Sequence, residues 1–137
     1  MATTLTGSCL CGGVHYRVCG EILRFYHCHC RRCRKATGTG HATNLMVRTD
    51  GVEWLAGASL LGRYRVPEAE RFFNQFCTGC GTPLPRWMPD RGMAVVPAGS
   101  LDMDPPLQPG ARIFWASRAP WSCEGDALPR FSEYPPP

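Results

Sequence analysis

The sequence predicts a small, mainly β protein of short antiparallel strands that is organised around metal sites. Short runs of β-branched and aromatic residues alternate with glycine and proline, whereas helical periodicity is nearly absent. Seven of the nine cysteines fall into tight clusters of the kind that bind metals. Because 137 residues is the size of one compact domain, we predict a single domain over residues 1–137, with its core at about residues 6–131.

The predicted strands are short apolar or alternating runs with turn residues at their ends. In chain order they are Val14–Val18, Leu23–Tyr26, Ala42–Val47, Val52–Leu55, Leu60–Val66, Arg71–Phe76, Leu84–Met88, Met93–Pro97 and Ala111–Phe114. The sequence predicts one short helical turn, which follows Cys33 and ends before Gly38 or Gly40. Asp102–Gly110 is predicted to be a surface loop, and the proline-rich C-terminal tail "YPPP" is predicted to be extended.

Composition and the N-terminal sequence limit the location and the partners. A formal net charge of +4 does not require nucleic acid or an anionic membrane as a partner. The chain lacks a run of about 18 apolar residues that would span a membrane, and its start lacks the basic and apolar segments of a secretory signal. We therefore expect no membrane association and a cytoplasmic location, in which thiols stay reduced.

The spacing of the cysteines favours metal binding over disulfides. The clusters Cys-x-Cys, Cys-x-Cys-x-x-Cys and Cys-x-x-Cys are too tight for ordinary disulfides within each cluster, and nine is an odd number of thiols. Zinc is the usual metal for such ligand sets. We predict two Zn²⁺ ions per chain.

Two of these clusters together supply the four ligands of one closed zinc site. Cys9 and Cys11 lie in "SCLCGG", and Cys77 and Cys80 lie in "FCTGCG". Four sulfurs complete a tetrahedron and leave no open position, so this site is predicted to be structural. Its loss should unfold the domain. The alternative is that these four cysteines are free buried thiols.

The remaining cluster, "CHCRRC", offers only three sulfurs, from Cys28, Cys30 and Cys33. A zinc ion with three protein ligands keeps a position for water or substrate, as catalytic sites do. The alternative is a fourth protein ligand, for which the candidates are Cys19, Cys123, His27, His29 and His41. Strand alternation would point His29 away from the flanking ligands, and His27 would need a local bend to reach the metal.

A basic run surrounds this second site. Arg31, Arg32, Arg34 and Lys35 could lower thiolate pKa values and attract an anionic thiol. They could equally compensate the charge of the cysteine thiolates. Contact with nucleic-acid phosphates is a third possibility, but the run is short and has no partner patch elsewhere in the sequence.

Several stretches spread over nearly the whole chain carry a family likeness. In order they are "GSCLCGGVHYRV", "CHCRRCRKATG", "FCTGCGTPL", "GSLD" and "RAPW". With them the chain resembles the glutathione-dependent formaldehyde-activating enzyme family, also called the centromere protein V/Gfa domain family. The resemblance implies a β-tent fold related to zinc ribbons, with two zinc ions. It assigns Cys9, Cys11, Cys77 and Cys80 to the structural site and Cys28, Cys30 and Cys33 to the catalytic site.

The resemblance also implies a reaction. It predicts a zinc-dependent carbon–sulfur lyase that joins or separates glutathione and a small aldehyde such as formaldehyde, through S-hydroxymethylglutathione. The zinc would bind the sulfur as a thiolate or polarise the aldehyde oxygen. Arg31, Arg32, Arg34 and Lys35 are candidates for the carboxylates of glutathione, and His27, His29 and His41 for proton transfer. Family members often have histidine and lysine where this chain has Arg112 and Arg118.

Two other functions use the same residues. A noncatalytic carrier would bind glutathione or zinc at the open site and release it unchanged. A zinc-ribbon interaction module would use the basic run to contact nucleic acid or protein. The tryptophans are predicted to pack in the core and at its edges.

Overall fold

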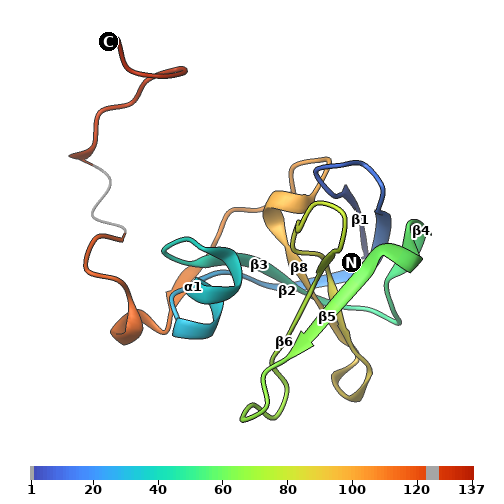
Figure 1. Cartoon of the computed structure of the whole chain (residues 1–137). Helices are drawn as coiled ribbons and strands as arrows, with labels where there is room; N and C mark the ends of the chain where they lie inside the picture. The colour runs from blue at the N-terminus through green and yellow to red at the C-terminus, as the bar shows by residue number, and fades with distance from the viewer. Residues whose placement is uncertain (1, 123–126) are drawn as a thin grey trace.

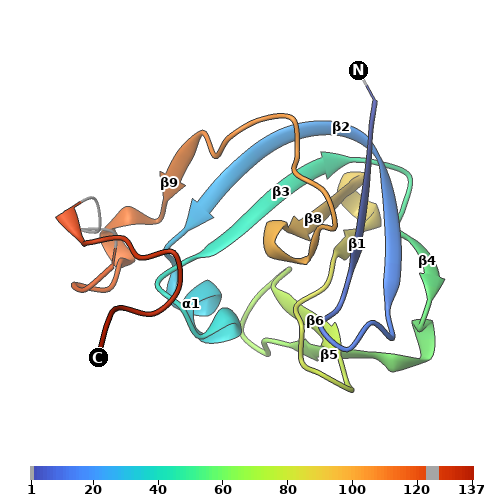
Figure 2. The same ribbon diagram turned by 90° about the horizontal axis from the view of Figure 1, so that it is seen from above.

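In the computed structural model, which describes residues 2–122 and 127–137, the chain is mainly β, as predicted, and has little helix. Its antiparallel strands form a curled sheet in which β1, β2, β3, β8 and β7 lie in that order, while β4 and β9 also pair with β2. Figure 2 shows how the long β2 bends around one side of this sheet. A separate hairpin of β5 and β6 completes the architecture (Figure 1).

The elements have the following bounds. The strands are β1 Thr3–Ser8, β2 His15–Cys28, β3 Ala42–Arg48, β4 Glu53–Ala56, β5 Leu61–Arg65, β6 Phe73–Cys77, β7 Arg86–Met88, β8 Met93–Pro97 and β9 Ala111–Ile113. The α-helix is α1 Arg31–Thr37, and short 3₁₀ turns are η1 Ala58–Leu60, η2 Pro89–Arg91, η3 Ala98–Ser100 and η4 Trp115–Ser117. The strand prediction Met93–Pro97 is confirmed to the residue.

The prediction of two strands at Val14–Val18 and Leu23–Tyr26 was wrong, because β2 is continuous. Its first half pairs with β1 and β4 and its second half with β3 and β9, with a bulge between Ile22 and Arg24. Gly20 lies between the two predicted strands, but it is not in a turn; it permits close packing of β2 against β3. A Cβ there would collide with the backbone carbonyl of Arg48 on β3.

Three further differences from the sequence predictions have local causes. The strand β1 was missed because its sequence, "TTLTGS", is mostly small and polar and gains its order by pairing with β2. The strand β9 pairs with β2 in parallel, not antiparallel. The helix begins at Arg31, before Cys33, because the Cys30 side chain caps it, and it ends before Gly38 as expected.

The core lies between the first half of β2, β3 and β8. Its fully buried members include Leu5, Val14, Tyr16, Val18, Leu45, Val47, Leu84 and Val96. A second, smaller cluster joins Cys28, Cys33 and Ala42, with Cys30, Phe72 and Ile113 packed against it. The cysteines of "CHCRRC" therefore belong to an apolar cluster of their own.

The predicted surface loop at Asp102–Gly110 is confirmed, since these residues contain neither a strand nor a helix. The final residues 134–137 are exposed and have no regular secondary structure apart from a bend. The chain after β9 leaves the sheet on the side of α1 (Figures 1 and 2). No helix in the described part of the chain is both long and apolar enough to cross a membrane.

Candidate metal centres

The structure brings Cys9, Cys11, Cys77 and Cys80 together, with their sulfurs within 4.8 Å of one another. The Sγ atoms of Cys9 and Cys11 are 3.5 Å apart, and those of Cys11 and Cys77 are 3.8 Å apart. Sulfurs at the corners of a zinc tetrahedron, with bonds of about 2.3 Å, would be about 3.8 Å apart. The donor set and its spacing therefore fit a closed four-thiolate metal centre.

Two turns hold these four sulfurs in place. The first lies between β1 and β2, where the Val14 amide donates to Cys9 Sγ at 3.2 Å. The second follows β6, where the Gly79 amide donates to Cys77 Sγ at 3.3 Å. Backbone N–H groups aimed at sulfur stabilise thiolates. The Leu10 amide also donates to Thr82 Oγ1, at 2.9 Å, and so ties the first turn to the second.

The structure brings Cys28, Cys30 and Cys33 together as a second centre, again with sulfurs within 4.8 Å of one another. Cys28 ends β2, and Cys30 and Cys33 flank the start of α1. The Cys33 amide donates to Cys30 Sγ at 3.3 Å, so the cap of the helix is itself one of the candidate ligands. This is why the helix starts where it does.

The charges of the three sulfurs also favour a cation among them. The hydrogen bond with Cys33, followed by smaller contributions, lowers the pKa of Cys28 to about 6. The same hydrogen bond, together with burial, raises the pKa of Cys33. Sulfurs this close share negative charge unequally, and a bound metal would allow all three to be thiolates.

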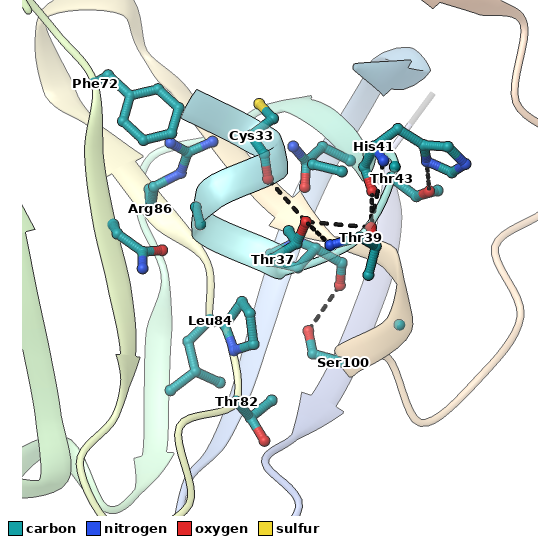
Figure 3. Close-up of a pocket in the computed structure, with 18 of the residues that line it drawn as sticks. Cys33, Thr37, Thr39, His41, Thr43, Phe72, Thr82, Leu84, Arg86 and Ser100 are labelled. Carbon is teal, nitrogen blue, oxygen red and sulfur yellow. Dashed lines mark hydrogen bonds between the residues drawn. The ribbon is translucent and has the colours of Figure 1, made fainter. Parts of the chain in front are cut away.

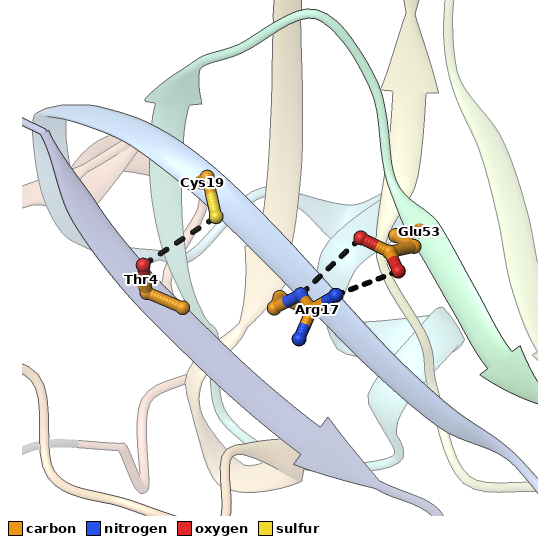
Figure 4. A network of polar contacts seen from close by, with 4 residues as sticks. All are labelled: Thr4, Arg17, Cys19 and Glu53. Atoms are coloured by element: carbon orange, nitrogen blue, oxygen red, sulfur yellow. Dashed lines mark hydrogen bonds and ion pairs between the residues drawn. The ribbon is translucent and has the colours of Figure 1, made fainter.

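Within residues 2–122 and 127–137, the second centre includes no fourth His, Cys, Asp or Glu ligand. Of the candidates, Cys19 lies elsewhere, exposed on β2, with its Sγ 3.4 Å from Thr4 Oγ1 and near the Arg17–Glu53 ion pair (Figure 4). Cys123 lies outside the described residues. The described chain thus leaves room for an exogenous ligand.

The three histidines form a cluster of their own. The His41 ring lies 4.3 Å from the His27 ring and 5.0 Å from the His29 ring, centroid to centroid. Thr43 Oγ1 lies 2.9 Å from His27 Nδ1 and 3.2 Å from His41 Nδ1. Burial is the main cause that lowers the pKa of each imidazole. The cluster is therefore neutral at pH 7.

Two cavities meet at the three-cysteine centre. A cysteine pocket of about 440 Å³ is lined by all three cysteines together with Arg31, Arg32, Arg86, Phe72, Ile113, Phe114 and others. A larger groove of about 800 Å³, called the polar groove for its hydroxyl, amide and imidazole groups, starts at Cys33. Those groups include Thr37, Asn74, His41, Thr82 and Ser100, and apolar side chains such as Leu84 and Trp121 line the rest. Figure 3 shows Cys33, Phe72 and Arg86 at one end of the groove and Thr82 and Ser100 at the other.

The predicted substrate contacts are divided between the cavities. Arg31 and Arg32 are exposed and line the cysteine pocket. Arg34 and Lys35 line a third cavity, of about 430 Å³, together with Arg31. Arg86 belongs to both the cysteine pocket and the polar groove. The sequence predicted a strand at Arg86 but no role for it, because it lies more than fifty residues after Cys33 in the chain.

The fold and the two cysteine centres define the class: a small β domain whose sheet and hairpin carry two sets of thiols that could hold metal ions. The model of the glutathione-dependent formaldehyde-activating enzyme family matches residues 4–117. The chain belongs to this family. The match covers every cysteine of the two centres.

Comparison with solved structures supports the fold. A crystal structure of a Rhodobacter sphaeroides protein, a structural genomics target, superposes with a TM-score of 0.60 at 23% sequence identity. The alignment covers 79% of this chain and 99% of that one. No curated protein sequence matches the chain. At this level of identity, the likeness is one of fold alone.

Proposed function

We propose that the protein is a zinc-dependent carbon–sulfur lyase that adds glutathione to formaldehyde, or reverses that addition, at the three-cysteine centre. In the forward direction a sulfur–carbon bond forms, the carbonyl double bond becomes a single bond, and the thiol proton is transferred to the carbonyl oxygen. The product is S-hydroxymethylglutathione. The observation that carries the proposal is a centre of three cysteines, with no fourth ligand in the described chain, that opens into two cavities.

In this proposal Cys28, Cys30 and Cys33 would hold a Zn²⁺ ion, which would stabilise a bound substrate sulfur as a thiolate. The residues around it bind and orient. The polar groove offers hydroxyl and amide groups along its length for the peptide backbone of glutathione. No aspartate or glutamate of the described chain lines the groove or the cysteine pocket, so a ligand with two carboxylates meets no repulsion.

His41 is the proton-transfer residue that the geometry favours. Among the three histidines it is the one that lines the polar groove together with Cys33. Burial and the positive charge of Arg112 lower its pKa, so the imidazole is neutral at pH 7 and can accept the thiol proton. Its Nδ1 is 3.2 Å from Thr43 Oγ1, which leaves Nε2 for the exchange.

The test is a rate comparison. NMR exchange spectroscopy on equilibrated glutathione and formaldehyde measures the rate of adduct formation with and without the zinc-loaded protein. We expect a rate above the uncatalysed reaction that is lost in Cys33→Ser and reduced in His41→Gln. Glutathione binding without rate enhancement would overturn the lyase proposal and support the carrier. Salt-dependent nucleic-acid binding without glutathione binding would support an interaction module.

A further inference from the structure

Arg86 has an environment unlike that of the other basic side chains near the cysteines. It lies on the short strand β7 and is partly buried, whereas Arg31 and Arg32 on α1 are exposed. Its Nη1 donates to the Phe73 carbonyl oxygen at 2.9 Å. Its guanidinium carbon lies 5.0 Å from the centre of the Phe72 ring, which covers it (Figure 3). The strand, the ring and the hydrogen bond fix the position of the charge.

The charge of Arg86 has no carboxylate partner. Within residues 2–122 and 127–137, no aspartate or glutamate oxygen lies within 4.0 Å of its guanidinium. A guanidinium withdrawn from water needs a compensating negative charge. Arg86 instead lines the same pocket as Cys28, Cys30 and Cys33. Thiolates of these cysteines would supply the negative charge that its guanidinium lacks.

The positive charge of Arg86 affects which molecule can bind as the fourth ligand of the three-cysteine metal centre. Three thiolates and one divalent zinc carry a net charge of −1, so a fourth anionic sulfur would bring the centre to −2. A fixed positive charge nearby offsets that increase, while a neutral fourth ligand gains much less from it. The exposed Arg31 and Arg32 are screened by solvent and contribute less.

We propose that Arg86 is a positioning residue that makes the three-cysteine centre select an anionic sulfur ligand over a neutral one. Arg86 lines the cysteine pocket together with all three cysteines, and it lines the polar groove together with Cys33. It therefore acts at the junction that a thiol must reach from either cavity. This inference rests on the proposed metal centre, but it does not depend on whether the bound thiol then reacts.

The experiment measures equilibrium binding to the zinc-loaded protein by calorimetry, with 2-mercaptoethanol as the thiol probe and imidazole as the neutral probe. We expect Arg86→Gln to weaken binding of the thiol by about tenfold or more, the size of effect that a nearby opposite charge has on an anion. Imidazole binding should change by less than about twofold. A thiol loss much larger than the imidazole loss is the expected signature, because a merely distorted pocket would weaken both.

Arg86→Lys separates charge from shape and should retain most of the thiol preference. Arg63→Gln is the matched control. Arg63 also lies over an aromatic ring, 3.7 Å from the Phe73 centroid, but it does not line either cavity at the cysteines. The control should leave both affinities unchanged. Equal losses for both probes in Arg86→Gln, or no loss for either, would overturn the inference.

If Arg86→Gln fails to retain its second zinc, Arg86→Lys decides. Retained metal and thiol binding in the lysine variant would support a role for the charge, and a lysine variant as damaged as the glutamine variant would overturn it. Failure of the wild-type protein to accelerate adduct formation would remove the lyase proposal alone, since these binding measurements require no reaction.

Discussion

The two cysteine centres use the same ligand type but differ in which parts of the chain they join. The four-cysteine centre joins a turn after β1 to a turn after β6, more than sixty residues apart. The three-cysteine centre takes its sulfurs from residues 28 to 33 alone, at the junction of β2 and α1. A metal in the first centre closes a long loop, whereas a metal in the second constrains almost no additional chain.

From this difference we infer that one small fold separates stability from chemistry. A metal that cross-links distant segments through four protein sulfurs is expected to contribute to folding. A metal held by one short segment is expected to contribute little to the fold, and its centre faces two cavities. Each of the following predictions tests that separation, in order of decreasing effect.

Cys77→Ser should have the largest effect. Cys77 is fully buried, and its loss breaks the proposed structural centre. Structural zinc contributes on the order of 10 kcal/mol in small metal-dependent domains, which exceeds the whole stability of an ordinary domain. We expect insoluble or unfolded chain, judged by circular dichroism and by solubility on expression. A soluble, folded Cys77→Ser protein would contradict the structural role.

Cys33→Ser should leave a folded protein that holds about one zinc and no longer binds thiols. Elemental analysis of the purified, reduced protein gives the metal count, with about two zinc ions expected for the wild type. The far-ultraviolet spectrum should match that of the wild type, because the fold does not depend on this centre. Equal damage from Cys33→Ser and Cys77→Ser would end the division between the two centres.

Tyr16→Phe should destabilise the core without releasing either metal. The Tyr16 hydroxyl lies 2.6 Å from Ser100 Oγ, and the Ser100 hydroxyl donates to the Pro97 carbonyl at 2.7 Å. Loss of the buried Tyr16 hydroxyl should reduce the free energy of unfolding by about 1 kcal/mol. Urea denaturation measures this loss, and zinc analysis checks the metals. Release of zinc by Tyr16→Phe would show that the core and the centres are coupled.

Low pH should weaken the folded state through the histidine cluster. Burial lowers the pKa values of His27, His29 and His41 below the ordinary value of about 6.5. Because the unfolded chain binds these protons more readily, their contribution to stability is complete above about pH 6.5 and is lost as the pH falls through the lower folded values. Urea denaturation at pH 7.5 and 5.5 should show the decline.

The matched variants for this pH effect are His41→Gln and His15→Gln. Removal of His41 should make the decline shallower, whereas His15 is exposed on β2 and outside the cluster, so its removal should not. Protonation of the cysteines affects all three proteins alike, and zinc content is measured at each pH. The same slope in His41→Gln and in the wild type would exclude the cluster as the cause.

Double substitution of Arg34 and Lys35 by alanine should have the smallest effect. Both residues line the third cavity, which does not include the cysteines, and Arg34 already donates to the Ser117 carbonyl at 3.2 Å. Solvent-screened contacts of this kind are worth up to about 1 kcal/mol, so KM for glutathione should rise by about threefold with kcat little changed. Arg24→Ala is the control, because Arg24 is exposed on β2 and lines none of these cavities. A loss of kcat/KM as large as that in Cys33→Ser would indicate that glutathione binds in this third cavity.

The sequence predicted the three short cysteine clusters because ligand spacing is a local property, and the need for four ligands then paired Cys9 and Cys11 with Cys77 and Cys80. Two cysteines separated by one or two residues must place their sulfurs close together, whatever the rest of the chain does. The same locality explains why the helix end at Gly38 and the strand Met93–Pro97 were predicted well. Local residue types decide a left-handed cap or a short apolar strand.

Contacts between residues far apart in the sequence were not predicted. The sequence offered no signal that β1 would order against β2, that Gly20 would lie against Arg48, or that Arg86 would line the cavities at the cysteines. Nor did it separate His41 from the other two histidines. Those relations are fixed by strand register and by the curl of the sheet, which depend on contacts between residues far apart in the chain. Local spacing thus determined which neighbouring sulfurs can share a metal, whereas tertiary structure brought Cys9 and Cys11 to Cys77 and Cys80 and decided what surrounds both centres.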